Sequence, residues 1–392
     1  MRLGDCLKMN LHSYSEKDKW SVIRYLDTGN ITEGRLNEVQ SLLVGRDKIP
    51  SRARRKVSIG DIVFSTVRPN QKHYGIIEEE IENLLVSTGF AVMTVNEEIA
   101  DPYFIYYFLT QPDIINSLQA IAEQSTSTYP SIKPSDIEGI EICLPALKTQ
   151  KKVSNILRVL DEKMKLNNRI NDNLYAQAKA TTKQWIAKST GDYELLPLSE
   201  IASINPDTYS PKEAWKYVNY LDTSSIIEGC IAEIQRITPS SEKLPSRARR
   251  KIAPNDIVFS TVRPNQRHYG IISEPLPNML GSTGFAVIRS KNPLVCNELI
   301  YLCLTENEFI EKMQQLAEQS TSTFPSIKPS DLGVCEIPCP KDQSSTSFTE
   351  TLKSLFALIA ANQRENISLS EIRDALLPKL MSGEIDVSGV QL

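Results

Sequence analysis

The chain has 392 residues, which is long enough for two or more domains that each bury a core of their own. Hydrophobic residues make up 41% of it and charged residues 23%, as in an ordinary globular protein, so a disordered or fibrous chain is excluded. The formal net charge is −4, and any affinity for nucleic acid therefore has to come from local basic patches.

Cysteine spacing and hydropathy bear on metal binding and on the cellular compartment. The seven cysteines include no pair of CxxC motifs, so zinc binding is not expected, and we expect all of them to be reduced. The first residues lack the apolar core of a signal peptide, and no apolar run is long enough to span a membrane. These features predict a soluble cytoplasmic protein with no bound metal and no membrane partner.

An internal repeat organises the chain. A single offset of 195 residues aligns the two halves without a gap. Between residues 49–77 and 244–272, 23 of 29 positions are identical, and between residues 120–135 and 315–330, 13 of 16 are identical. Two copies of this length are too few and too long for a solenoid, so they predict two equivalent domains.

Each repeat begins with a globular segment of mixed composition. Residues 22–26, 61–65 and 90–95 are short runs rich in β-branched and apolar residues, bounded by turn-forming residues, and this pattern predicts strands. Residues 102–122 carry apolar side chains at a spacing near 3.6, which predicts one helix. The mixture indicates an α+β fold.

Each repeat ends with a predicted long helix. Residues 149–186 contain neither Gly nor Pro, and a narrow apolar seam at heptad spacing runs through them and through the copy 195 residues later. Asn167 and Asn171 interrupt the seam, and Asn362 and Asn366 interrupt the copy at the matching positions. Because buried Asn fixes register, we expect the two helices to pair with each other as an antiparallel coiled coil.

These elements give a fold class and a set of domain boundaries. The class is α+β, with two globular domains separated by the two long helices and related by a pseudo-two-fold internal repeat. We place the first globular domain at residues 1–148, the central long helix at 149–190, the second globular domain at 191–343, and the C-terminal long helix with its tail at 344–392.

Two basic stretches, one in each globular segment, form the candidate DNA-binding surface. Residues 46–72 hold eight Lys or Arg against two Asp, and residues 241–267 hold seven against two acids. Lys and Arg neutralise phosphates, while Asn, Gln and Arg can read base edges. A Ser/Thr-rich stretch followed by Lys adds further polar groups, although a turn whose hydroxyls bond their own backbone is an equally good interpretation. The candidate DNA-facing residues are Arg52, Arg54, Arg55, Lys56, Arg68, Asn70, Gln71, Lys72, His73, Tyr74, Ser125, Thr126, Ser127, Thr128 and Lys133 in the first copy, and Arg247, Arg249, Arg250, Lys251, Arg263, Asn265, Gln266, Arg267, His268, Tyr269, Ser320, Thr321, Ser322, Thr323 and Lys328 in the second.

No catalytic motif accompanies these patches in the sequence. Glycine-rich nucleotide or methyl-donor loops are absent, and the Asp161-Glu162-Lys163 spacing that some nucleases use has no upstream acidic partner. We therefore expect a protein that binds double-stranded DNA without being an enzyme. The alternative is a non-catalytic coiled-coil scaffold that joins protein partners, and retention on duplex DNA compared with an acidic polymer separates the two hypotheses.

The motifs together resemble one known family. The order globule, long helix, globule, long helix and the Asp-Ile-Val-Phe-Ser segment before each polar patch are similar to the specificity subunit of type I restriction–modification systems. So are the Ser/Thr-rich turn before Ile-Lys-Pro-Ser-Asp and the string LLPKLMSGEI at residues 376–385. The resemblance covers essentially the full length. The first copy departs from that string at residues 181–186, so its helix is expected to end differently.

This resemblance implies a set of partners and a division of labour. Each globular domain would be a target-recognition domain that reads one half of a bipartite DNA site. The helices would set the spacing and dock methyltransferase subunits, expected to be two, through which restriction and translocase subunits attach. S-adenosylmethionine, ATP and Mg would be bound by those partners, with no cofactor on this chain.

The duplication also predicts the symmetry of the DNA target. Candidate residues are nearly identical in the two copies, and the changes, such as Lys72 to Arg267, are mild. Identical reading surfaces should prefer nearly identical short sequences. If antiparallel helices relate them by an approximate two-fold axis, the target is an interrupted palindrome.

Overall fold

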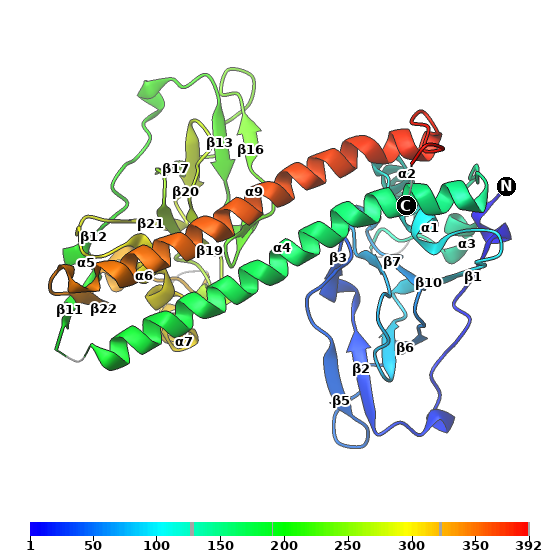
Figure 1. Cartoon of the computed structure of the whole chain (residues 1–392), viewed down its shortest axis with the longest axis horizontal. Helices are drawn as coiled ribbons and strands as arrows, with labels where there is room; N and C mark the ends of the chain where they lie inside the picture. The colour runs from blue at the N-terminus through cyan, green and yellow to red at the C-terminus, as the bar shows by residue number, and fades with distance from the viewer. Residues whose placement is uncertain (126–128, 190, 321–323, 391–392) are drawn as a thin grey trace. The chain divides into compact units, whose positions relative to one another are not determined.

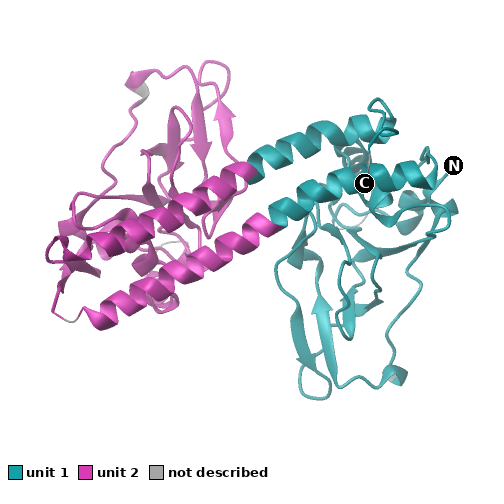
Figure 2. Ribbon diagram, viewed as in Figure 1, with its two compact units in different colours: residues 1–165, 366–392 teal, residues 166–365 magenta. Residues whose placement is uncertain are grey.

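The computed structural model describes residues 1–125, 129–189, 191–320 and 324–390. The chain divides into two compact units, of which unit 1 comprises Met1–Lys165 with Asn366–Leu392 and unit 2 comprises Leu166–Glu365 (Figure 2). Each unit therefore holds one globular segment together with part of both long helices. The boundaries between units fall inside the helices, whereas the sequence placed domain boundaries at the helix ends.

Unit 1 contains two four-stranded sheets and a small hairpin. The first sheet is antiparallel throughout, in the order β1 (Leu7–Met9), β10 (Phe90–Val95), β7 (Ile62–Ser65), β8 (Tyr74–Ile76). The second follows the order β5 (Gln40–Leu43), β2 (Val22–Leu26), β9 (Leu84–Ser87), β6 (Ala53–Lys56), and its β2 and β9 are parallel. The hairpin is β3 (Ile31–Thr32) with β4 (Arg35–Leu36). Three of these strands, β2, β7 and β10, lie where the sequence pattern predicted strands.

The first sheet of unit 1 is covered on both faces, which explains why its central strands are almost continuously apolar. Alternate side chains of a strand point to opposite faces. Val63 and Val92 pack in a cluster with Leu26 of the second sheet, whereas Phe64 and Met93 pack in the cluster that contains the helices. Within unit 1, the second sheet lies farther from the long helices than the first (Figure 1).

Three short helices complete the globular part of unit 1, namely α1 (Pro102–Leu109), α2 (Pro112–Glu123) and α3 (Pro134–Glu138). The Asp101 side chain caps α1 by accepting a hydrogen bond from the Phe104 N–H at 2.9 Å. The prediction of one helix over residues 102–122 is wrong, because the chain turns at Thr110 and a new helix starts at Pro112. Proline lacks an N–H and its ring clashes with the preceding turn, so it begins a helix readily but does not continue one.

Unit 2 repeats this arrangement strand for strand. Its first sheet follows the order β12 (Ala202–Ile204), β21 (Phe285–Ser290), β18 (Asp256–Ser260), β19 (Tyr269–Ile272), and its second the order β16 (Gln235–Ile237), β13 (Val218–Leu221), β20 (Met279–Ser282), β17 (Ala248–Lys251). The small hairpin is β14 (Ile226–Ile227) with β15 (Cys230–Ile231), and an added pair is β11 (Tyr193–Pro197) with β22 (Glu336–Pro340). Its short helices are α5 (Leu198–Ile201), α6 (Asn297–Leu304), α7 (Asn307–Glu318) and α8 (Pro329–Gly333).

The two long helices are α4 (Leu147–Lys188) and α9 (Thr346–Ser382), and each contributes to both units. In unit 1, Leu157 of α4 shares a buried cluster with Leu377 and Leu380 of α9. In unit 2, the Trp185 ring stacks on Phe348 with centroids 4.4 Å apart. Because the start of α4 meets the end of α9 in unit 1 and the reverse holds in unit 2, the helices run in opposite directions within each unit.

The seam asparagines make one of the expected contacts. The Asn362 amide donates a hydrogen bond to the Asn171 carbonyl oxygen at 2.8 Å, which confirms an Asn–Asn pair between the helices. Asn167, fully buried, instead donates to the carboxylate of Glu365 at 2.7 Å. In the part of the chain that the structure describes, no helix is long and apolar enough to cross a membrane.

Candidate nucleic-acid interface

Backbone hydrogen bonds bring the start of β6 together with the end of β7 in unit 1. The Thr88 N–H donates to the Arg52 carbonyl at 2.8 Å. The next residue, Gly89, accepts at its carbonyl from both the N–H and the hydroxyl of Thr66, at 2.8 and 2.9 Å. The turn between β9 and β10 therefore links the first basic stretch to the loop that follows β7.

The same loop is also tied to the segment after α2. The Arg68 N–H donates to the Pro130 carbonyl at 2.9 Å, and the Ile132 N–H donates to the Thr66 carbonyl at 2.9 Å. Three stretches that lie far apart in the sequence, around residues 52–56, 66–73 and 129–133, thus meet on one side of unit 1. Each of the three contains residues that were predicted from sequence to face DNA.

Unit 2 contains the same network at the positions 195 residues later. The Thr283 N–H donates to the Arg247 carbonyl at 2.8 Å, and the Arg263 N–H donates to the Pro325 carbonyl at 2.9 Å. The Thr261 N–H donates to the Gly284 carbonyl at 2.8 Å. Since the framework is the same, the two units present their candidate residues in the same way.

A strained loop carries the second polar patch. Arg68 and Lys72 flank the 3₁₀ turn Pro69–Gln71 with φ values of 48° and 57°, and Arg263 and Arg267 have values of 48° and 57° in unit 2. A non-glycine residue in this left-handed region costs about 1–3 kcal/mol and persists only where its surroundings hold it. Strain that recurs at both copies of a polar loop is typical of a functional site.

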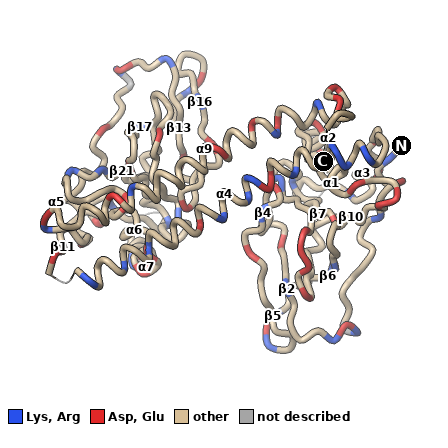
Figure 3. Tube along the Cα trace, viewed as in Figure 1, with Lys and Arg blue, Asp and Glu red and all other residues tan. Residues whose placement is uncertain are grey.

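Four cations of this surface in unit 1 are exposed and have no ion pair among the residues that the structure describes: Arg52, Arg54, Arg68 and Lys133. The Arg68 guanidinium lies over the Tyr129 ring, 5.2 Å from its centroid, which orients the side chain. Figure 3 shows acidic and basic residues interspersed over both units. The cations without an ion pair are therefore confined to particular places on the surface. Of the counterparts in unit 2, Arg247 and Lys328 are exposed, whereas Arg249 and Arg263 are half-buried, and Arg263 lies over Phe324 at 4.9 Å.

Other predicted cations are engaged with carboxylates of the same unit. Lys56 pairs with Asp18 and lies over the Trp20 ring, 5.2 Å from its centroid. Lys72 pairs with Glu33 at 2.6 Å. The matching pairs in unit 2 are Lys251 with Glu213 and Arg267 with Glu228. Exposed pairs of this kind contribute only about 0–1 kcal/mol, so a phosphate can compete for Lys72, whereas Lys56 is held in place by both partners.

Arg55 and Arg250 have a distinctive environment. Within the described part of the chain, their Nε atoms are buried donors without a hydrogen-bond acceptor. Burial lowers the pKa of both guanidinium groups. A buried donor without an acceptor costs about 1–3 kcal/mol, and the same cost occurs in both units.

The prediction that Tyr74 and Tyr269 face DNA is wrong. Their exposed fractions are 5% and 2%. The Tyr74 ring stacks on Phe64 with centroids 5.6 Å apart and contacts Tyr106 edge-on, and burial raises the pKa of its hydroxyl. Each tyrosine begins a strand, β8 or β19, whose partner strand directs a phenylalanine to the same face, so the ring belongs to the core.

The remaining predicted residues are polar and line the same loops. Asn70 and Gln71 are exposed, as are Asn265 and Gln266. His73 is half-buried, and its Nδ1–H donates to the Ile31 carbonyl at 2.7 Å; His268 repeats this contact in unit 2. The Ser125 hydroxyl accepts a hydrogen bond from the Ser131 N–H at 3.3 Å, and Ser320 repeats it. Thr126, Ser127, Thr128, Thr321, Ser322 and Thr323 lie outside the described residues.

Two supporting residues were missed in the sequence. The Gln119 side chain on α2 accepts a hydrogen bond from the Asn70 N–H at 3.2 Å, and Gln314 accepts from Asn265 at 3.3 Å. Thr66 contributes the hydroxyl contact described above. All are identical at the 195-residue offset, and this identity was the signal that could have found them. No group of three or more His, Cys, Asp or Glu in the described residues could hold a metal ion.

Comparisons with known proteins agree with this geometry. Residues 11–176 match the family described as type I restriction modification DNA specificity domain. The chain is 22% identical to the type I restriction enzyme HindI specificity subunit of Haemophilus influenzae, over 98% of each chain. It is 24% identical to the MjaIX specificity subunit of Methanocaldococcus jannaschii, over 78% of this chain and 73% of that protein. The crystal structure of the type I restriction–modification S subunit from M. genitalium shares the fold, with a TM-score of 0.55 at 16% identity over 97% of this chain and 95% of that one.

The matched domain and the duplicated polar surface define a DNA-recognition protein. Residues 11–176 carry the DNA specificity domain of type I restriction–modification systems, and the chain is similar to specificity subunits of such systems over nearly its full length. The curated relatives named above are both specificity subunits of type I restriction enzymes.

Proposed function

We propose that each unit reads one half of a bipartite DNA site through the surface built by residues 52–56, 66–73 and 129–133 and their copies. The observation that carries this proposal is the repetition of one hydrogen-bond framework in both units, with the same residue types at the same positions and with the same exposed amides. A framework that only stabilised the fold would not need two exposed amides, Asn70 and Gln71, on a strained loop in each copy.

The side chains divide into two roles. Arg52, Arg54 and Lys133 are exposed and have no ion pair among the described residues, so they suit phosphate contacts that position the unit without reading sequence. Asn70 and Gln71 lie at the tip of the loop beside Arg68, and these are the residue types that make bidentate contacts with adenine and guanine in the major groove. Their copies do the same in unit 2.

The symmetry of the target follows from the near identity of the two surfaces. Equal reading residues on equal frameworks prefer equal half-sites. If an approximate two-fold axis relates the two units, as the internal repeat predicts, the second half-site is inverted and the site is an interrupted palindrome. The helices then set the length of the unread spacer.

The catalytic steps belong to partner proteins in this proposal. Two methyltransferase subunits dock on the long helices, and restriction and translocase subunits attach through them in the cytoplasm. S-adenosylmethionine, ATP and Mg are bound by those partners. Purified chain alone neither methylates nor cuts DNA.

The experiment is to express this chain with its methyltransferase subunit and to map methylated bases by single-molecule sequencing. We expect one short half-site, a spacer and its inverted repeat. An Arg68→Ala/Arg263→Ala variant should lose methylation at that site, while Lys8→Ala, an exposed cation on β1, should not. Two unrelated half-sites would show that residues outside the repeated surface do the reading, and methyl transfer by the chain alone would contradict the division of labour.

A further inference from the structure

The duplication raises a question of partner choice. Helices α4 and α9 are copies with asparagines at matching positions, Asn167 with Asn362 and Asn171 with Asn366. A helix with such a seam could pair with the same helix of a second chain as well as with its copy. The seam positions that differ between the copies show what separates these two outcomes.

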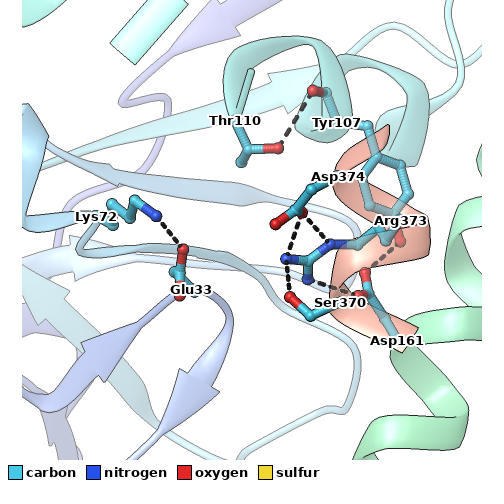
Figure 4. Close-up of polar contacts among 8 residues, drawn as sticks. All are labelled: Glu33, Lys72, Tyr107, Thr110, Asp161, Ser370, Arg373 and Asp374. Atoms are coloured by element: carbon cyan, nitrogen blue, oxygen red, sulfur yellow. Dashed lines mark hydrogen bonds and ion pairs between the residues drawn. The ribbon is translucent and has the colours of Figure 1, made fainter. Parts of the chain in front are cut away.

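In unit 1 the seam contains an ion pair. The Arg373 guanidinium on α9 donates to the Asp161 carboxylate on α4 at 2.9 Å, and each side chain is only 21% exposed. The Tyr107 hydroxyl donates to the other Asp161 oxygen at 2.6 Å, and Arg373 also binds Asp374 and Ser370 (Figure 4). Burial alone would lower the pKa of Arg373, but the two carboxylates raise it, so the guanidinium stays charged with Asp161 as its partner across the seam.

In unit 2 the matching positions are apolar. The 195-residue offset places Phe356 at the position of Asp161, and Ala178 at the position of Arg373. Both are buried in one cluster, and the Phe356 ring contacts Tyr301 edge-on with centroids 5.7 Å apart. Thus α4 carries the acid and the small residue, while α9 carries the base and the large residue.

A second pair of matched positions also differs between the two units. In unit 2, Trp185 of α4 stacks on Phe348 of α9 with nearly parallel planes, 6° apart, and its indole N–H donates to the Ser345 hydroxyl. In unit 1 the equivalent positions are Val153 of α4 and Leu380 of α9, which share a buried cluster. The two aromatic rings meet only when α4 pairs with α9.

Pairing of like helices breaks these contacts. Two antiparallel α4 helices in the same register would set Asp161 against Ala178 of the other copy, and two α9 helices would set Arg373 against Phe356. Asp161 would then be partly buried without its counter-ion, and Arg373 would keep only its neighbour Asp374, which is a destabilising arrangement. The Trp185 ring would lose its aromatic partner as well.

We propose that the Asp161–Arg373 and Trp185–Phe348 contacts are pairing determinants, which join α4 to α9 of the same chain and reject a second copy of α4. The isolated chain therefore closes on itself as a monomer. This inference concerns the helices alone and does not depend on which DNA sequence is read.

The test uses the full chain and charge reversal. Asp161→Arg, Arg373→Asp and the swap Asp161→Arg/Arg373→Asp are compared with the wild type by light scattering at several concentrations and by thermal unfolding. We expect a monomeric wild type, and single variants that melt at lower temperature and self-associate as concentration rises. The swap should return to a monomer and recover more than half of the lost melting temperature. The matched control is Glu162→Arg, an exposed neighbour whose pair with Arg158 lies outside the seam.

Several outcomes would overturn the proposal. One is a swap variant that is no better than the single variants, because then the two residues are not coupled. Another is single variants that stay monomeric and as stable as the control. A third is a wild type that dimerises through its α4 helices. If a charge reversal prevents folding, Asp161→Asn keeps the shape without the charge, and it must lower stability more than Glu162→Gln does.

Discussion

The Asn362 side-chain amide donates a hydrogen bond to the Asn171 carbonyl oxygen at 2.8 Å in the helix seam of unit 2. These residues come from different helices and stand at different positions of the repeat, and the antiparallel helices bring them together in one register. Two amides in a seam otherwise built from apolar side chains stabilise less than leucines would, but they penalise every shifted register.

Removing one or both of these amides should have opposite effects on stability. Asn171→Leu leaves the Asn362 amide without its partner, which should cost about 1–3 kcal/mol and lower the melting temperature by several degrees. The double variant Asn171→Leu/Asn362→Leu replaces both polar groups and should recover this loss or exceed the wild type. Thermal unfolding of the three proteins checks the expectation. A double variant that is less stable than the single one would show that the amides serve contacts other than each other.

The sequence predicted the seam pair because helical periodicity is a local pattern and the same two asparagine positions recur in both copies of the repeat. Strands β2 and β10 could also be predicted from the sequence, since short β-branched runs between turn residues are typical of strands. Tyr74 was misjudged because its burial depends on Phe64, a partner on another strand that no local pattern reveals. Asp161 could not be recognised as a seam ion pair either, since Arg373 lies more than two hundred residues away and the copy holds Phe356 instead.

The buried Nε donors of Arg55 and Arg250 give a prediction that separates stability from binding. Arg55→Met and Arg250→Met remove a buried donor without an acceptor and keep the aliphatic volume, so folding stability should be unchanged or slightly higher. DNA affinity should fall, because we propose that these half-buried guanidinium groups contact a phosphate or base. Thermal unfolding and fluorescence anisotropy with a duplex that carries the methylated site measure the two effects. Loss of stability without loss of affinity would make these residues part of the fold only.

The exposed cations predict how binding depends on salt. Each phosphate contact contributes about 0.9 to the slope of log affinity against log salt concentration. Arg52→Ala and Arg54→Ala should each lower the slope by about this amount if the residue contacts one phosphate, and they should weaken specific and non-specific duplexes alike. Lys8→Ala is the control on β1 and should leave the slope unchanged. Anisotropy titrations at four or more salt concentrations provide the slope, and a fall in affinity confined to one sequence would assign these arginines to base reading.

Tyr74 provides a test of its place in the core. Tyr74→Phe keeps the ring between Phe64 and Tyr106 and should leave both stability and DNA affinity close to wild type. Tyr74→Ala removes a buried aromatic ring and should cost about 3–5 kcal/mol of unfolding free energy. Denaturant titrations give the second value. A Tyr74→Phe variant that folds normally but binds DNA poorly would show that the hydroxyl takes part in DNA binding.

The supporting glutamines test whether the two units act as equals. Gln119 and Gln314 each hold the backbone of the amide-bearing loop through one hydrogen bond, to Asn70 and Asn265 respectively, so Gln119→Ala and Gln314→Ala should each free that loop in one unit only. Losing one such bond costs about 0.5–1.5 kcal/mol, which corresponds to about 2–10-fold in affinity. On an interrupted palindrome the two variants should lose the same factor in affinity, and the double variant should lose the square of that factor, because the units do not share the affected contacts.

The control is Ser117→Ala on the same helix α2, since its hydroxyl bonds only its own helix backbone. Affinity is measured by fluorescence anisotropy on duplexes in which one half-site at a time is scrambled. On a duplex that retains a single half-site, the two single variants should lose affinity by the same factor. Unequal losses on the intact site would mean that the two units read different sequences despite their identical loops.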